Sequence, residues 1–309
     1  MMSPADFLAD LLNPDLVFLP KALAVAVMSS IACGVVGCYV VLRGMAFIGD
    51  TVAHAVFPGL AVAFVAGGNL VLGGAAAGVV TAVLIAVVAQ NRRLREDSVI
   101  GICFVAAFAL GIVVISRAPG YAGSLQQFLF GSITGIPTSD LYVVAGTGAA
   151  VLAALTALRK ELVTVALDRE SARATGVPVF WLDLALYVLV TLAVVISVQT
   201  IGNILVLALL VTPAATARLL TDRLTVMLWL APVIGSAAAV VGLYLSWSFD
   251  LPTGGVVVLV LTAGFLAAWT LAPRHGVLAR RTTRRRVPDD TPPPHPAPLP
   301  ARADEGAPA

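Results

Sequence analysis

Charged residues are scarce in this chain of 309 residues. They make up only 12% of it, against about 25% in a typical soluble domain, whereas hydrophobic residues reach 59%. Long stretches hold no charge at all. A helix that crosses a bilayer needs roughly 20 mostly apolar residues. Repeated stretches of that length exclude a large soluble domain and predict an all-α, polytopic integral membrane protein.

The sequence also lacks features that would indicate an enzyme. It has no phosphate-binding loop of the form GxxxxGKS or GxxxxGKT, and no Ser/His/Asp or Cys/His arrangement indicates a nucleophile. Cys33, Cys38 and Cys103 lie in apolar stretches without zinc-site spacing, so we expect packing roles for them. No Lys or Arg precedes Lys21, so the basic start of a cleavable signal peptide is missing. We therefore expect a chain that does not hydrolyse ATP itself.

Nine apolar stretches approach the length of a membrane span. They cover residues 22–42, 46–66, 70–90, 98–117, 141–158, 180–199, 201–220, 224–247 and 253–272. The second is the poorest, since it contains Asp50, His54 and Pro58. Pro58 and Pro213 predict kinks within helices, because neighbouring groups can satisfy the carbonyl that proline frees. Only residues 200–203 are left for the turn between the sixth stretch and the seventh.

Basic clusters predict the orientation of the spans. Up to residue 273 the chain holds 12 basic and 13 acidic side chains, most of the basic ones at 92–95, 159–173 and 218–223. The positive-inside rule places these clusters, and the Arg-rich segment after the last span, in the cytoplasm. Two spans separate each cluster from the next, so the C-terminus is cytoplasmic. Lys21 and Arg43 flank the first span and oppose each other, which leaves eight spans or nine and either side for the N-terminus.

The chain divides into a membrane domain, residues 1–273, and a basic, proline-rich tail, residues 274–309. The tail has seven basic and four acidic side chains and no apolar periodicity, so it is predicted to be disordered and gives no indication of nucleic-acid binding. The segment 118–140 is expected on the extracytoplasmic side. Its amphipathic part, residues 125–133, is predicted to lie along the membrane surface or to cap a cavity.

Asp50 and His54 are the strongest candidates for chemistry. Their i, i+4 spacing puts them on one helix face with Cβ atoms about 5–6 Å apart. An ionisable residue at membrane depth costs at least about 2.5–3.5 kcal/mol, so it usually faces protein or water. A carboxylate and an imidazole make half a site for Mn(II), Zn(II) or Fe(II). His54 must be neutral to bind, so metal occupancy should fall as the pH drops.

A simpler interpretation of the same pair needs no metal. Asp50 would cap the helix after Gly49, and His54 would pair with it. Two ligands do not make a site, although a symmetric dimer would bring four together. Spacing alone leaves both interpretations open.

The second candidate is the charged cytoplasmic segment 159–179. Asp168 can cap a short helix, with Glu170 in its first turn and Gly176 as its stop. Such a helix is suited to docking a cytoplasmic partner, although an ordinary hydrated loop is the alternative. Asp183 and Asp250 fall near predicted span ends, where a hydrated carboxylate needs no function.

Three stretches, taken in order, carry a likeness to a known family. They are VVLRGMAFIGDTVAHAVFPG at 40–59, LDRESARATGVPV at 167–179 and QTIGNILVLALLVTPAATARLL at 199–220, with smaller matches at 97–102 and 250–254. Over about residues 16–272 the chain resembles the permease subunits of ATP-binding-cassette importers for zinc, manganese and iron. The resemblance implies a permease fold like that of the vitamin B12 importer, in the plasma membrane.

The resemblance also implies partners and residue roles. Two copies would enclose a central path, two cytoplasmic ATPase subunits would dock on the coupling segments, and an extracytoplasmic binding protein would deliver the metal as cargo. No permanently bound cofactor is implied. Asp50 and His54 match the family's residues that line the path and can bind the metal. The residues that match its coupling segment are Asp168, Glu170, Ala172, Arg173 and Gly176.

Two other functions compete with metal import. A permease for a metal chelate, haem or another small solute would leave Asp50 and His54 as packing residues. An ion-coupled secondary transporter often shows inverted repeats, and the chain has no convincing internal repeat. The sequence does not identify the metal.

Overall fold

The structure, a computed structural model, describes residues 3–45, 47–90, 94, 96–116 and 137–272. Within this part nine helices are long and apolar enough to cross a membrane. They are α2 (Phe18–Leu42), α3 (Ile48–Val65), α4 (Leu70–Val88), α5 (Glu96–Ile115), α7 (Thr138–Ala157), α10 (Val179–Ile201), α11 (Asn203–Leu220), α12 (Leu224–Phe249) and α13 (Thr253–Leu271). All nine predicted spans are present, with ends shifted by at most four residues.

Some predictions fall on residues outside the described part. These are the three arginines of the cluster at 92–95, the amphipathic stretch 125–133 and the tail 274–309. Pro58 and Pro213 lie inside α3 and α11, as predicted, and Pro232 lies inside α12. The turn between α10 and α11 is tighter than predicted, because Gly202 alone makes it, with a φ of 84° that favours glycine.

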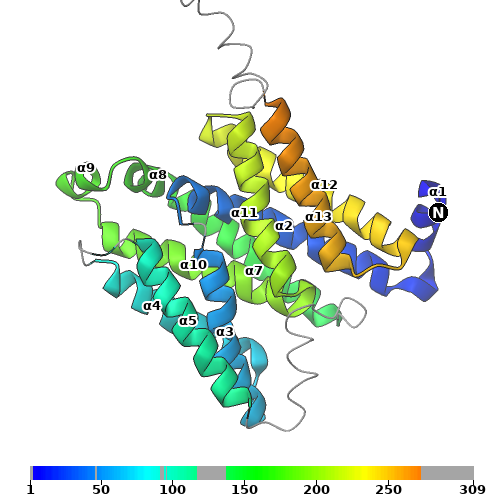
Figure 1. Cartoon of the computed structure of the whole chain (residues 1–309), viewed down its shortest axis with the longest axis horizontal. Helices are drawn as coiled ribbons and strands as arrows, with labels where there is room; N and C mark the ends of the chain where they lie inside the picture. The colour runs from blue at the N-terminus through cyan, green and yellow to red at the C-terminus, as the bar shows by residue number, and fades with distance from the viewer. Residues whose placement is uncertain (1–2, 46, 91–93, 95, 117–136, 273–309) are drawn as a thin grey trace, which may run out of the picture.

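The helices pack as two groups around α2 and α10 (Figure 1). One group is α3, α4 and α5, and the other is α11, α12 and α13; α2 and α10 both contact α7 and lie between the groups. Small residues allow the closest approaches. A Cβ on Gly37 of α2 would lie 1.8 Å from the carbonyl oxygen of Leu210 in α11, and one on Gly59 of α3 would lie 2.1 Å from that of Gly73 in α4. Backbone-to-backbone packing of this kind is typical of helices in lipid.

The first turn of α3 lies inside the membrane domain rather than at its edge. A Cβ on Gly49 would lie 2.3 Å from the side chain of Leu210. A Cβ on Gly37 would meet the backbone of the same residue. The start of α3 is therefore level with Gly37, which precedes the end of α2 by five residues, or about 7–8 Å of helix. The turn after α2 begins to fold back at Met45, whose amide donates to the carbonyl of Val40 at 3.0 Å.

Three short elements were not predicted. At the N-terminus, α1 (Pro4–Leu11) has a capping box between Ser3 and Asp6 and is followed by a 3-10 turn (Pro14–Leu16). α1 lies against the end of α12, where Trp247 donates to Asp10 at 2.9 Å. On the far side of the molecule, α8 (Arg159–Leu167) precedes the predicted short helix, α9 (Arg169–Ala174), as Figure 1 shows.

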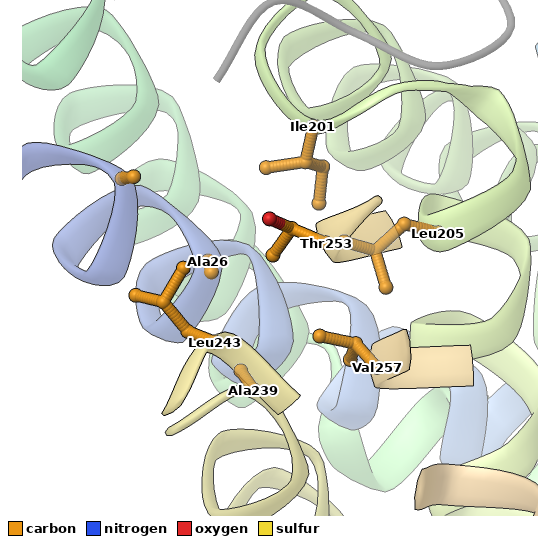
Figure 2. A pocket seen from close by; sticks show the side chains of 8 residues that line it. Ala26, Ile201, Leu205, Ala239, Leu243, Thr253 and Val257 are labelled. Carbon is orange, nitrogen blue, oxygen red and sulfur yellow. The ribbon is translucent and has the colours of Figure 1, made fainter. Parts of the chain in front are cut away.

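A small void lies between α2, the end of α10, α11, α12 and α13 (Figure 2). It measures about 10 Å³, barely the volume that one water needs. Its walls are alanine, isoleucine, leucine and valine side chains, apart from Thr253, whose hydroxyl already bonds Ser246 at 2.7 Å. The void is therefore a packing defect and not a ligand site.

Candidate functional site

Helix α3 presents Asp50 and His54 on one face, as predicted. The N-cap of the helix is Phe47, and no side chain bonds the free amides there, so the capping part of the simpler interpretation is wrong. Its other part, the pairing of the two side chains, is present, since Asp50 Oδ1 lies 3.4 Å from Nε2 of His54. The Asp50 side chain is 32% exposed and that of His54 15%. The pair is therefore set in the protein but remains open on the carboxylate side.

Aromatic rings and an amide from two other helices surround His54. Phe104 and Phe108 of α5 present edge contacts to the imidazole, with centroids 5.0 and 4.8 Å from it, and are parallel to each other. Nδ2 of Asn203 lies 3.3 Å from His54 Nε2. Asn203 is buried and is the first residue of α11. The turn at Gly202 places it beside His54.

Polar atoms at this site remain without partners. Within the described part, His54 Nδ1 and Asn203 Oδ1 are buried and make no hydrogen bond. A buried polar atom without a partner costs roughly 1–3 kcal/mol, so each such atom calls for an explanation, of which a bound water or ion is one. Asp50 and Asn203 both lie at His54 Nε2, so Asn203 Oδ1, and not His54 Nδ1, can join them around one ligand. Rotating the Asn203 amide by half a turn would bring Oδ1 to the His54 side. A carboxylate oxygen, an imidazole nitrogen and an amide oxygen can thus converge on one point.

Asn203 was not identified as a site residue from the sequence. Without it, Asp50 and His54 supply only two ligands, which do not form a full site. In the described ranges no group of three His, Cys, Asp or Glu side chains is close enough to hold a metal ion. Asn203 supplies the third donor. Its only signal in the sequence is an amide residue beside the glycine of an apolar hairpin, which is equally typical of a turn.

The second candidate region is helix α9, and its local design matches the prediction. Asp168 caps it, accepting from the amides of Glu170 at 2.9 Å and Ser171 at 3.1 Å. Hydrogen bonds from Ser171 hold the pKa of Asp168 below its usual value. Gly176, with a φ of 81°, ends the helix. Ala172 is fully buried and anchors α9, so it cannot touch a partner directly.

The exposed side of α9 carries Glu170 and Arg173. Asp168 and Gly176 are also exposed, and α9 lies at one extremity of the molecule, as Figure 1 shows. This is a charged, rigid and accessible surface.

Asp183 behaves differently from its prediction. It was expected to be hydrated, but its side chain is only 11% exposed, and each of its oxygens accepts from a different arginine. Arg43 Nη1 donates to Oδ1 at 2.5 Å, and Arg169 Nη2 donates to Oδ2. Burial lowers the pKa of Arg43, whereas the charge of Asp183 raises it. The prediction failed because Arg43 is 140 positions from Asp183 and Arg169 is 14 positions from it in another helix, which a local pattern does not show.

Comparison with known proteins decides the family. Residues 15–272 match the model described as the ABC 3 transport family. The chain belongs to this family. The manganese transport system membrane protein MntC of Halalkalibacterium halodurans is 42% identical to it over 270 residues, which cover 87% of this chain and 92% of the relative. The chelated iron transport system membrane protein YfeC of Yersinia pestis is 36% identical over 278 residues, 90% and 94% of the two chains.

A solved structure of the family has the same fold. The structure described as PsaBC from Streptococcus pneumoniae in complex with Fab matches with a TM-score of 0.80 at 35% identity, over 92% of this chain and 100% of that one. The all-α, polytopic permease fold is thereby confirmed. This member of the ABC 3 transport family is the membrane-spanning subunit of an ATP-binding-cassette transporter.

Proposed function

We propose that this permease imports a divalent transition metal, Mn(II) first and Fe(II) second, past Asp50, His54 and Asn203. The observation that carries the proposal is the convergence of these three side chains within a helix bundle of membrane-span length, with the buried amide oxygen of Asn203 left unpaired. Carboxylate and carbonyl oxygens suit manganese, and one imidazole adds affinity for manganese or iron. The manganese and iron names of the relatives agree with this donor set.

The spacing of the pair fits one shared ion. Two metal–ligand bonds of about 2.1 Å span about 3.0 Å when they meet at the roughly 90° of an octahedral ion and about 3.4 Å at the roughly 110° of a tetrahedral one. The separation between Asp50 Oδ1 and His54 Nε2 is 3.4 Å. An ion could therefore replace the contact between the two side chains with little movement of α3. When the ion leaves, Asp50 and His54 return to each other, so neither is left as an unpaired polar group in the membrane.

Metal import requires partners, which we propose as follows. A separate cytoplasmic ATPase docks on the exposed residues of the coupling segment, Asp168, Glu170, Arg173 and Gly176, while buried Ala172 anchors it. An extracytoplasmic binding protein delivers the metal. Two copies of the permease face each other across the path, which doubles the donor set. The tail then lies in the cytoplasm, and the complex in the plasma membrane.

Metal uptake by the intact complex of permease, ATPase and binding protein tests the site. In proteoliposomes, Asp50→Ala and His54→Ala should each abolish uptake of Mn(II) and the stimulation of ATP hydrolysis by loaded binding protein. Asp250→Asn is the matched control, since this exposed carboxylate lies beyond α12 and asparagine also tolerates its left-handed backbone. Unchanged uptake of Mn, Fe and Zn in both site variants would exclude the site.

The docking surface has its own test. Glu170→Arg should reduce co-purification of the ATPase, whereas Glu161→Gln on neighbouring α8 should not. If Glu170→Arg binds the ATPase as tightly as the parent chain, α9 is not the docking helix.

A chelate is the second candidate cargo, favoured by the chelated iron name of the relative from Yersinia pestis. A chelate brings its own ligands, so Asp50→Ala and His54→Ala would then leave uptake of the chelated metal intact. Parallel assays with free Mn(II) and with a chelated iron distinguish the two cargoes.

A further inference from the structure

We propose that Asp183 couples helix α9, where the ATPase docks, to the turn that leads into the metal-site helix α3. Asp183 and its two arginine partners are positioning residues in this role, and the inference rests on the proposed docking of the ATPase on α9. The carboxylate lies in the first turns of α10 and holds Arg169 of α9 with one oxygen and Arg43 with the other.

Arg43 lies just before the metal-site helix in the chain. It is the C-cap of α2. Gly44 follows it with a φ of 70°, and α3 begins at Ile48. A second contact fixes the same turn to α10, because the hydroxyl of Tyr187 donates to the sulfur of Met45 at 3.7 Å. The turn is held at Arg43 and at Met45, and the carbonyl of Met45 accepts from the amide of Ile48, the first residue of α3, at 3.1 Å. A displacement of Arg43 is therefore passed to Asp50, seven residues later.

Asp183 and Arg43 can also pair in a second arrangement. Arg43 is only 5% exposed, and its Nε and Nη2 have no hydrogen-bond partner in the described part. An arginine–carboxylate pair is strongest when two parallel hydrogen bonds join the two groups. If Arg169 withdraws, both oxygens of Asp183 become available to Arg43, which can then bind them through two nitrogens. Asp183 is thus either shared between two arginines or paired with one.

There is room for Arg169 to withdraw. A cavity of about 390 Å³ between the end of α4, α9 and α10 is bordered by Arg169, Arg173 and Asp183. The Arg169 side chain is 37% exposed, so it can leave without opening the packed core. A movement of α9 driven by the ATPase would take Arg169 with it, because Asp168 and Gly176 make α9 a rigid unit. Asp183 then binds Arg43 through both of its oxygens, and the turn at Arg43 moves with this change.

The variants that test this contact are Asp183→Asn and Arg169→Gln. Asp183→Asn keeps the size and one acceptor oxygen, and Arg169→Gln changes a partly exposed side chain, so both should fold. Glu161→Gln on α8 is the control. We expect both variants to bind the ATPase and to hydrolyse ATP, while Mn(II) taken up per ATP falls about tenfold, within the about 5–150-fold typical of coupled sites. Arg169→Lys should restore part of the ratio, because lysine keeps one charged donor.

Amide hydrogen exchange gives a readout that a purely structural contact would not move. In the full complex, ATP binding should change the exchange of residues 44–50 in the parent chain and leave it unchanged in Arg169→Gln. This arm uses no metal, so it distinguishes failure of the coupling from failure of the metal assignment. An unchanged ratio of Mn(II) to ATP in both variants, or a parental exchange response in Arg169→Gln, would overturn the inference. Loss of ATPase binding in Arg169→Gln would also overturn it, by making Arg169 a docking residue.

Discussion

Two charged groups flank the same turn of the chain, and they are built in opposite ways. At Asp50 and His54 the carboxylate meets one imidazole at 3.4 Å, and polar atoms beside it remain unpaired. At Asp183 both carboxylate oxygens are occupied by arginines. An incomplete donor set can exchange a ligand, whereas a carboxylate held by two arginines can transmit displacement. In the proposed function the membrane domain would therefore separate the exchange of cargo from the transmission of movement.

The separation has a physical basis in the cost of burial. An ionised group away from water is tolerated when it is paired, and removing one partner of a buried pair is strongly destabilising. Asp183, at 11% exposure, is held under this constraint, whereas Asp50, at 32%, keeps some contact with solvent. In the proposed cycle Asp50 releases His54 to bind the ion, so it cannot depend on that contact for stability, whereas Asp183 keeps Arg43 when Arg169 leaves.

The largest expected difference between the two groups is in stability. Asp183→Ala leaves Arg43 buried without an anion, and we expect a loss of about 3 kcal/mol, the lower part of the usual range because Arg169 reaches solvent. Asp50→Ala should cost much less. Half-lives of the detergent-solubilised permease at a fixed raised temperature measure both, since unfolding of such proteins is commonly irreversible. Equal losses in the two variants would contradict the comparison.

Mn(II) should stabilise the permease through Asp50 and His54 and not through Asp183. Mn(II) at a hundred times its Kd should stabilise the parent chain by about 2.7 kcal/mol. Asp50→Asn and His54→Gln should lose this gain, and lowering the pH should reduce it because a protonated imidazole cannot bind. Asp183→Asn should keep it. The same thermal assay, with Mg(II) as the control ion, reports the effect; stabilisation by Mn(II) in both site variants would locate the binding elsewhere.

Asn203 should have a smaller effect on the same site. Asn203→Leu removes the amide donor, and we expect an affinity for Mn(II) about tenfold weaker, comparable to losing a supporting ligand contact. Asn203→Asp keeps an oxygen and should retain binding. Asn69→Asp, at the cap of α4, controls for the added charge, since aspartate also caps helices well. Equal affinities in the leucine variant and the parent chain would limit the site to Asp50 and His54.

The sequence predicts the spans well because their signal is local. About 20 apolar residues between charged or turn residues are enough to place α4 or α13. The i, i+4 pair on α3 and the cap and stop of α9 are also local, so they could be predicted. Each depends on residues within one or two turns of each other.

Contacts between distant helices could not be predicted in this way. Asn203 meets His54 across 149 positions, and Asp183 meets Arg43 across 140. Asp183 looked like an ordinary hydrated acid because its partners come from other elements. The depth of Asp50 likewise depends on how α3 doubles back beside α2. The third donor of the site and the coupling contact are therefore products of the fold.

The smallest expected effect concerns the cap of α9. Asp168 is fully exposed, and its pKa lies below the usual 3.8 because Ser171 donates to it. A carboxylate whose pKa is lowered on folding stabilises the folded state above its usual pKa, and the gain disappears as the pH falls through the lowered value. The cap should therefore persist at every pH above 3.8 and fail only in stronger acid. Asp168→Asn should cap at all pH values, because asparagine keeps the acceptor oxygen.

Amide-exchange protection of Glu170 and Ser171, corrected for the intrinsic pH dependence of exchange, measures this cap directly, since both amides donate to Asp168. Asp168→Ala should lose the protection at neutral pH and weaken ATPase binding less than Glu170→Arg does. Asp168→Asn should keep both. Protection that is the same in the alanine variant as in the parent chain would mean that α9 is held by buried Ala172 rather than by its cap, and the docking surface would then owe its rigidity to packing.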